Sequence, residues 1–223
     1  MTTELLQAVE LQTHPEPSAS VIWLHGLGAD GYDFVPVVRE LERLGVPAAR
    51  YVFPHAPTRP VTINGGYVMR AWYDILGTDL VRREDEDGIR DSQRHVEALI
   101  AREVARGTPR SRIVLAGFSQ GGAITLQTGL RQLEPVAGLL ALSTYLPLAS
   151  DFEAERAPAS RAVPIFMAHG RSDPVIPLVR ATTSRDQLKG AGYDVEWHEY
   201  EMPHSVCEEE IRQIAGFLKR VLA

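Results

Sequence analysis

The chain has 223 residues, a length that fits one large domain or two small ones and allows a sizeable hydrophobic core. Its formal net charge is −6 and its Lys and Arg residues are scattered, which argues against a nucleic-acid-binding surface. The single cysteine, Cys207, excludes an internal disulfide, and the sequence shows neither a secretion signal nor an apolar run of the ~20 residues that a membrane-spanning helix needs, so we expect a cytoplasmic protein.

Apolar runs predict strands in the first part of the chain at 5–11, 20–24 and 50–53. The first of these alternates only weakly and carries acidic residues, so we place it at an edge of the sheet. Apolar residues at helical spacing predict one helix that Asp33 caps and Gly45 ends, and a second, long helix from Ile89 to Gly107.

Residues 57–88 interrupt this alternation with a Gly65-Gly66 pair, aromatic residues at 67, 72 and 73, and a charge run at 82–87. Long irregular segments in compact domains are often functional. The aromatic residues are consistent with a substrate cleft and equally with a seal over the edge of the core. We interpret the charge run as a solvated loop that leads into the next helix.

The second half of the chain continues the alternation, with strands predicted at 113–116, 136–142, 163–168 and 195–200 and helices at 123–132, 178–189 and 206–222. Strands that alternate with helices predict an α/β fold with a mostly parallel central sheet and helices on both faces. No linker or repeat divides the sequence, so we expect residues 1–223 to form a single domain.

A Gly-x-Ser-x-Gly pentapeptide at 117–121 joins a buried strand to a helix, which is the context of a nucleophile elbow. The pentapeptide alone also fits an ordinary glycine-bearing turn. The strand-to-helix context favours Ser119 as a nucleophile, because a sharp turn holds the hydroxyl clear of its own backbone. We expect Gly117 and Gly121 to be glycines because the turn brings neighbouring backbones too close for side chains.

A serine nucleophile needs a base, and the base needs an orienting carboxylate, both on loops beyond the carboxyl ends of strands. Asp173 meets this condition, because it follows the predicted strand 163–168. Asp186 lies inside a predicted helix, and Asp194 begins a strand at the opposite edge of the sheet.

The order Ser, Asp, His leaves two histidines as the base. His198 lies within a predicted strand, where alternation puts it on a sheet face. His204 follows that strand by a short loop, and the Ser205 to Glu208 spacing predicts a capping box that opens the last helix. These positions favour His204.

Stabilisation of an oxyanion needs two N–H donors. We expect one from Gln120, the residue after the nucleophile, and one from Leu27 in the glycine-rich turn 25–31. That turn also matches a dinucleotide-binding Gly-x-Gly-x-x-Gly from Gly26, but no acidic residue follows at the spacing that ribose binding requires.

Two other kinds of site, a metal centre and a cysteine nucleophile, have less support. His25, His55 and His169 lie near predicted strand ends, but no short-spaced ligand pair or carboxylate cluster accompanies them, so we expect no metal. Cys207 lies near His204, but no elbow surrounds it, and we interpret it as a half-buried residue of the first helical turn.

The chain resembles the α/β-hydrolase superfamily and, within it, the carboxylesterase, acyl-protein thioesterase and lysophospholipase family, on the segments 25–31, 70–75, 117–122, 169–173 and 204–205. The run Arg70-Ala71-Trp72-Tyr73-Asp74-Ile75 is closer to the bacterial carboxylesterases. The resemblance implies an α/β-hydrolase fold, a catalytic triad of Ser119, Asp173 and His204, and an oxyanion hole at Leu27 and Gln120. It also implies that the 57–88 segment borders the acyl pocket, with Trp72 and Leu76 near it.

The expected function is hydrolysis of carboxylic esters, and of thioesters, with short to medium acyl chains, through an acyl-enzyme and without a cofactor. The alternatives are an acyl-protein thioesterase or lysophospholipase that acts on long-chain lipid substrates, a transacylase that uses the same triad, and a non-catalytic ligand-binding protein, against which the complete triad weighs. We expect a small acyl ester or thioester as the partner, no nucleic acid and no integral membrane segment, and a homodimer stays open.

Overall fold

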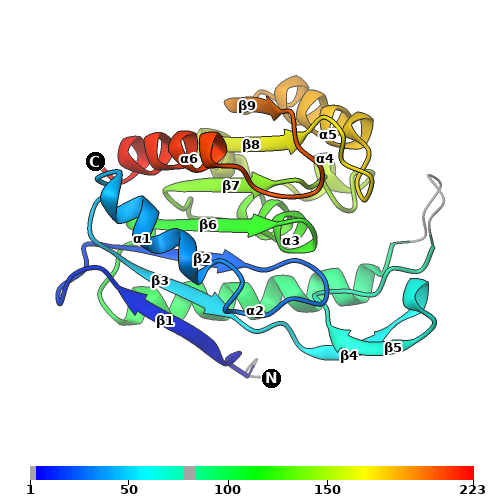
Figure 1. The fold of residues 1–223 in the computed structure, drawn as a ribbon, viewed down its shortest axis with the longest axis horizontal. Coiled ribbons are helices and arrows are strands. Elements are labelled where there is room, and N and C mark those ends of the chain that lie inside the picture. Colours follow the sequence, from blue (N-terminus) through cyan, green and yellow to red (C-terminus); the bar gives the residue numbers. More distant parts are fainter. Residues whose placement is uncertain (1–3, 78–83) are drawn as a thin grey trace.

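A seven-stranded sheet runs through the computed structural model, which describes residues 4–77 and 84–223 (Figure 1). The strand order is β1-β3-β2-β6-β7-β8-β9, and within this sheet only β1 runs antiparallel to its neighbour. The strands are β1 (Ala8–Gln12), β2 (Ala19–Leu24), β3 (Ala49–Pro54), β6 (Ile113–Phe118), β7 (Gly138–Leu142), β8 (Ile165–Gly170) and β9 (Val195–Tyr200). The predicted fold class, a mostly parallel sheet in a single domain, is confirmed, and β1 is the edge strand that we expected.

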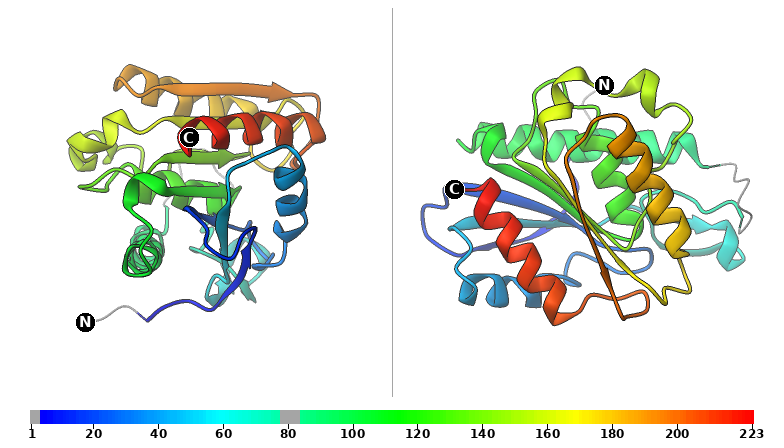
Figure 2. Two further views of the ribbon diagram at one scale, coloured as in Figure 1. Left: turned by 90° about the vertical axis from the view of Figure 1, so that its left-hand side faces the viewer. Right: turned by 90° about the horizontal axis from the view of Figure 1, so that it is seen from above.

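Helices cover both faces of the sheet (Figure 2). They are α1 (Val35–Arg43), α2 (Glu86–Ala105), α3 (Gln120–Gly129), α4 (Phe152–Glu155), α5 (Leu178–Gly190) and α6 (Glu208–Val221), with 3₁₀ turns at Thr62–Asn64, Arg110–Arg112 and Pro158–Ala162. Side chains alternate along each strand, so β2 sends Ile22 and Leu24 into the core under α2, α3 and α5 and sends Val21 and Trp23 into the core under α1 and α6. All of β2 is buried, as a continuous apolar strand requires.

The parallel strands β2, β6, β7, β8 and β9 end at one edge of the sheet, on the right in Figure 1. The loops that follow these strands therefore meet there. Among the described residues, no helix has the length and apolar character needed to cross a membrane.

The 57–88 segment contains a hairpin that the sequence analysis did not predict, formed by β4 (Thr58–Val61) and β5 (Tyr67–Arg70). Gly65 and Gly66 make its turn with positive φ values of 66° and 78°. A hydrogen bond to the chain beyond the hairpin holds it in place: the Ile63 amide donates to the Ile75 carbonyl at 3.0 Å. Residues 78–83 of this segment, with Arg82 and Arg83 of the charge run, lie outside the described residues.

The structure corrects two helix caps. Helix α1 begins at Val35 after Phe34, with no side-chain cap, so the predicted cap at Asp33 is wrong. Helix α6 begins at Glu208 after Cys207, also without a side-chain cap, so the capping box from Ser205 is wrong. Phe34 instead stacks on Trp23 with ring centroids 5.0 Å apart, and this core contact fixes the start of α1.

Helix α2 begins three residues before the predicted Ile89 because part of the charge run belongs to it. Glu86 and Asp87 form its first turn, and the Asp85 carboxylate accepts a hydrogen bond from the Gly88 amide at 3.0 Å. Negative charges at the N-terminus of a helix interact favourably with the positive end of its dipole. Residues 85–87 of the run therefore cap and begin this helix rather than forming only a solvated loop.

Candidate active site

Ser119 lies at the turn between β6 and α3, with φ 55° and ψ −119°. A positive φ is strained for a residue other than glycine and is typical of functional turns. A Cβ on Gly117 would lie 2.3 Å from the Gly121 carbonyl oxygen, and a Cβ on Gly121 would lie 2.4 Å from the Leu24 carbonyl oxygen. Both positions therefore exclude side chains, as expected.

The structure brings Ser119, His204 and Asp173 into one hydrogen-bonded chain. The Nδ1 atom of His204 lies 2.6 Å from Oδ2 of Asp173, and its Nε2 atom lies 2.9 Å from Oγ of Ser119. An ionised carboxylate only accepts hydrogen bonds, so Nδ1 carries the proton and donates a hydrogen bond to Asp173. The Nε2 lone pair then accepts the hydrogen bond of the Ser119 hydroxyl.

Asp173 is fixed by the loop that carries it. Its Oδ1 atom accepts hydrogen bonds from the amides of Val175 and Ile176 at 2.8 and 2.9 Å. His169 is a near neighbour, with Nε2 donating to the Ile176 carbonyl at 2.9 Å and lying 3.4 Å from Oδ2 of Asp173. Burial lowers the pKa of His169 and so favours its neutral form. His204 is the closer partner of the carboxylate, at 2.6 Å against 3.4 Å for His169.

The two expected oxyanion donors lie on neighbouring turns. Gln120 is the first residue of α3, where backbone N–H groups have no partner inside the helix. Leu27 lies in the turn after β2, which approaches the nucleophile so closely that a Cβ on Gly26 would lie 3.5 Å from Cβ of Ser119. The two turns therefore lie next to each other at Ser119, and their role as an oxyanion hole stays a prediction.

His25 supports the turn after β2, a role that the sequence analysis missed. Its Nε2 atom accepts a hydrogen bond from the Ala56 amide at 3.0 Å, so Nδ1 carries the proton that is donated to the Gly26 carbonyl at 2.7 Å. Burial lowers the pKa of His25 to about 4 and keeps it neutral. The Gly26 carbonyl and the Leu27 N–H belong to one peptide group, so His25 orients that N–H.

Trp72 connects both turns. Its amide donates to Oε1 of Gln120 at 2.8 Å, Nε2 of Gln120 donates to the Tyr73 carbonyl at 2.7 Å, and the Trp72 indole N–H donates to the His25 carbonyl at 2.9 Å. The Gly28 amide adds a hydrogen bond to the Arg70 carbonyl at 2.9 Å. We call residues 70–73 the clamp segment, because it ties together the loops that carry both expected donors.

The two residues expected near the acyl pocket have different surroundings. Trp72 is fully buried, so in this conformation its side chain does not line an open surface. Leu76 is 45% exposed and lines a small cavity together with Tyr73 and Tyr145. That the 57–88 segment borders the acyl pocket stays a prediction, and which of its side chains reaches this cavity depends on contacts distant in sequence.

The alternative candidates lie in other surroundings. His198 pairs with Glu196 at 2.9 Å, Asp186 pairs with Arg185 at 2.8 Å, and Cys207 is partly buried at the start of α6. Within residues 4–77 and 84–223, no group of three or more His, Cys, Asp or Glu side chains is placed to hold a metal ion.

Comparison with known proteins gives consistent matches over nearly the whole chain. A model of the phospholipase/carboxylesterase family matches residues 7–222. An acyl-protein thioesterase 1 of Mycosarcoma maydis is 43% identical over 93% of this chain and 92% of that protein. Among solved structures, SOBER1 of Arabidopsis thaliana has 31% identity and a TM-score of 0.87, covering 92% of this chain and 99% of its own. Acyl-protein thioesterase 2 of Zea mays has 25% identity and a TM-score of 0.84, covering 97% and 99% respectively.

Proposed function

The chain belongs to the phospholipase/carboxylesterase family and is an esterase-type serine hydrolase, and from that premise we propose that it cleaves carboxylic esters and thioesters of short to medium acyl chains through an acyl-enzyme on Ser119. The observation that carries this proposal is the hydrogen-bonded chain from Ser119 through His204 to Asp173 at a serine with positive φ.

The first half of the reaction transfers the acyl group to the enzyme. Nε2 of His204 takes the Ser119 proton while Oγ bonds to the acyl carbonyl carbon, and the carbonyl electron pair moves to its oxygen. The amides of Leu27 and Gln120 donate to that oxyanion. His204 then gives its proton to the leaving alcohol or thiol as the bond to the acyl carbon breaks.

The second half repeats these steps with water. His204 takes a proton from water as the water oxygen bonds to the acyl carbon, and the proton returns to Oγ of Ser119 as the carboxylic acid leaves. Asp173 holds His204 in the tautomer that leaves Nε2 free to accept in both halves.

A fluorophosphonate probe tests the nucleophile, because it bonds only to an activated serine. We expect the probe to add to Ser119, as located by peptide mass mapping, and Ser119→Ala to abolish both labelling and hydrolysis of p-nitrophenyl butanoate without unfolding the protein. Turnover above about 0.1% of wild type in this variant would contradict the assignment. Competing alcohols and amines in the assay would reveal a transacylase by its products.

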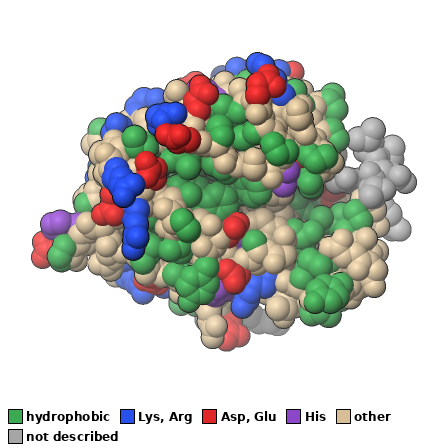
Figure 3. All heavy atoms as spheres, in the orientation of Figure 1, with side chains coloured by type: hydrophobic (Ala, Val, Ile, Leu, Met, Phe, Trp, Pro, Cys, Tyr) green, Lys and Arg blue, Asp and Glu red, His purple; other side chains and the backbone are tan. Residues whose placement is uncertain are grey.

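Action on long-chain acyl-protein or lysophospholipid substrates is a second candidate. The thioesterase names of the relatives favour it, as do exposed apolar side chains on and beside the β4–β5 hairpin, namely Ile63, Tyr67 and Val68 at 40, 70 and 60% exposure. Figure 3 shows apolar side chains at the surface in this part of the molecule. Palmitoyl-peptide hydrolysis faster than butanoate ester hydrolysis would establish it. Residence in the cytoplasm and dimerisation stay predictions.

A further inference from the structure

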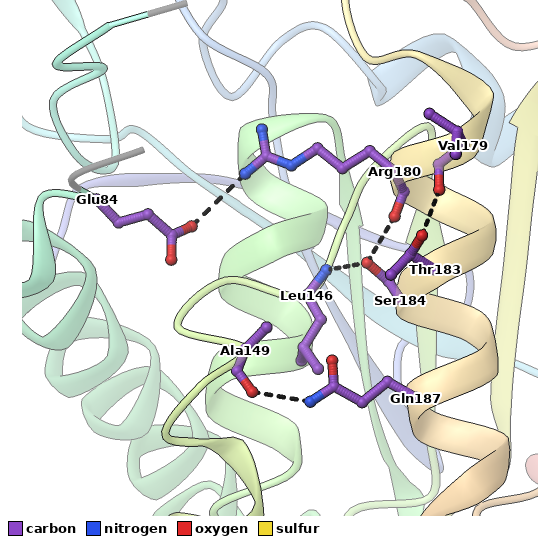
Figure 4. A pocket seen from close by; sticks show the side chains of 8 residues that line it. All are labelled: Glu84, Leu146, Ala149, Val179, Arg180, Thr183, Ser184 and Gln187. Carbon is purple, nitrogen blue, oxygen red and sulfur yellow. Dashed lines mark hydrogen bonds and ion pairs between the residues drawn. The ribbon is translucent and has the colours of Figure 1, made fainter. Parts of the chain in front are cut away.

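A cavity of about 400 Å³ lies between the 145–149 loop and the first turns of α5 (Figure 4). Its lining consists of Glu84, Leu146, Ala149, Val179, Arg180, Thr183, Ser184 and Gln187. The cavity is close to the catalytic loops, because the hydroxyl of Thr144, two residues before Leu146, donates to the Ser119 carbonyl at 2.7 Å. Its size falls within the range of ligand pockets.

The polar side chains on the α5 wall of this cavity already have partners in the protein. Ser184 Oγ donates to the Arg180 carbonyl and accepts from the Leu146 amide, both at 2.9 Å. Thr183 and Gln187 each donate to a main-chain carbonyl at 2.8 Å, as Figure 4 shows. The cavity therefore offers mainly aliphatic surface, which suits a hydrocarbon chain.

A second, much smaller cavity of about 10 Å³ lies on the catalytic side, lined by Tyr73, Asp74, Ile75, Leu76, Gly77, Glu84 and Tyr145. It adjoins the oxyanion loops, because the Tyr73 carbonyl accepts the hydrogen bond from the Gln120 side chain. Tyr145 lines the small cavity, Arg180 lines the large one, and Glu84 lines both, so the contact of Arg180 with the Tyr145 ring lies between the two cavities.

Four side chains in contact make a wall here. The Tyr73 and Tyr145 hydroxyls are hydrogen-bonded at 2.7 Å, and the Arg180 guanidinium lies 3.2 Å above the centre of the Tyr145 ring. Arg180 pairs with Glu84 at 3.6 Å, and Glu84 accepts a hydrogen bond from the Leu148 amide at 2.8 Å. The two tyrosines are almost fully buried, whereas Arg180 and Glu84 are each 20% exposed at their side chains.

We propose that the wall of Tyr73, Tyr145, Arg180 and Glu84 ends the acyl site and limits the length of the acyl chain, and that the 400 Å³ cavity behind it receives the distal part of a longer chain when Arg180 is removed. This inference rests on the proposed function. Arg180 is the removable part of the wall, because it reaches across from α5 and a partly exposed ion pair is held only weakly.

The test is kcat/KM for p-nitrophenyl esters from butanoate to hexadecanoate in the wild type and in Arg180→Ala. Each methylene that gains apolar contact is worth about fourfold in kcat/KM. We expect the dodecanoate-to-butanoate ratio to rise about tenfold or more in Arg180→Ala. Arg185→Ala is the matched control, because Arg185 is on the same helix and also lies over an aromatic ring, at 4.9 Å from the Trp197 ring, but does not line the cavity.

Two further variants keep the inference falsifiable. Val179→Trp, added to Arg180→Ala, should fill the cavity and return the ratio to the wild-type value. Glu84→Gln should shift the ratio in the same direction as Arg180→Ala but less, and it serves if Arg180→Ala does not fold. An unchanged dodecanoate-to-butanoate ratio in folded variants, or an equal change of kcat/KM at every chain length, would overturn the proposal that these side chains limit the acyl chain. If the wild type does not hydrolyse the butanoate ester, or if Ser119→Ala still does, the proposed function itself is refuted.

Discussion

Replacement of Trp72 by phenylalanine tests whether the clamp segment positions the oxyanion donors. The change removes the indole N–H from the buried His25 carbonyl and leaves the main-chain bonds of Trp72 to Gln120 and Ser92 in place. Trp23→Phe is the matched control, because Trp23 is also buried, at 1% exposure, while its indole N–H has no hydrogen-bond partner among the described residues.

Both substitutions remove the same indole ring area, so their difference isolates one hydrogen bond. A buried carbonyl that loses its donor costs about 1–3 kcal/mol, and we expect Trp72→Phe to be less stable than Trp23→Phe by that amount. Removal of an entire oxyanion donor lowers kcat by about 10² to 10³. Relaxation of one anchor of the turn that carries Leu27 should cost less, about tenfold in kcat, with KM nearly unchanged.

The assays are urea unfolding followed by far-UV circular dichroism, which does not depend on the tryptophans, and initial rates with p-nitrophenyl butanoate. Equal kcat in the two variants would refute the positioning role. A raised KM with unchanged kcat would show instead that Trp72 contacts the substrate, as the resemblance implied. A trifluoromethyl ketone forms a tetrahedral adduct on the serine, so Trp72→Phe should bind it more weakly than the wild type does, by about the same factor as kcat falls.

Three other predictions follow from the surroundings of single residues. Gly121→Ala should lower the free energy of unfolding by about 1–3 kcal/mol or more, because its Cβ would meet the Leu24 and His25 carbonyl oxygens at 2.4 and 2.5 Å. Gly216→Ala in α6 is the control: its Cβ would have nothing within 4 Å, so it should raise the free energy of unfolding by about 0.5–1 kcal/mol in the same urea assay. Because burial lowers the pKa of His25 from 6.5 to about 4, the unfolded state binds the extra proton between these values, so stability that is complete above pH 6.5 should fall by about 3 kcal/mol down to pH 4; a His25→Gln variant with the same pH slope would contradict this. Burial raises the pKa of Glu210 from 4.5 to about 8, so the unfolded state loses its proton first and the free energy of unfolding falls as pH rises through this window. The free energy of unfolding of Glu210→Gln should equal that of the wild type near pH 4 and exceed it by up to about 5 kcal/mol at pH 8. A difference that does not grow with pH would refute a neutral buried Glu210.

The seven strands of the main sheet and the helices longer than one turn were all predicted from the sequence, most directly where a strand is a continuous buried apolar run, as in β2, β6, β7 and β8. The β4–β5 hairpin was missed, since its four-residue strands are half exposed and contain Pro60. Its stability comes from contacts such as the hydrogen bonds of Thr62 to Asp74, which no local pattern reveals.

The helix caps show a competition that propensity alone does not resolve. Asp33 has the right side chain for a cap, but the stacking of Phe34 on Trp23 sets where α1 begins. In the candidate site, the chain order of strand-end residues pointed to Ser119, Asp173 and His204. The supporting bonds of His25 and Gln120 join segments 31 to 48 residues apart, and they could be seen only once the loops were placed in space.

Ser119 and His204 are 85 residues apart in the chain, and this spacing has a consequence during protein synthesis. At about 5–20 residues per second, a ribosome adds the histidine roughly 4 to 17 s after the serine. Through that interval the nascent chain carries a serine without its base and cannot acylate itself on cellular esters. Until β9 is made, β8 is also an open sheet edge that invites wrong pairing. Because β9 precedes His204 in the chain, the period in which β8 is an unpaired edge begins before this histidine is made.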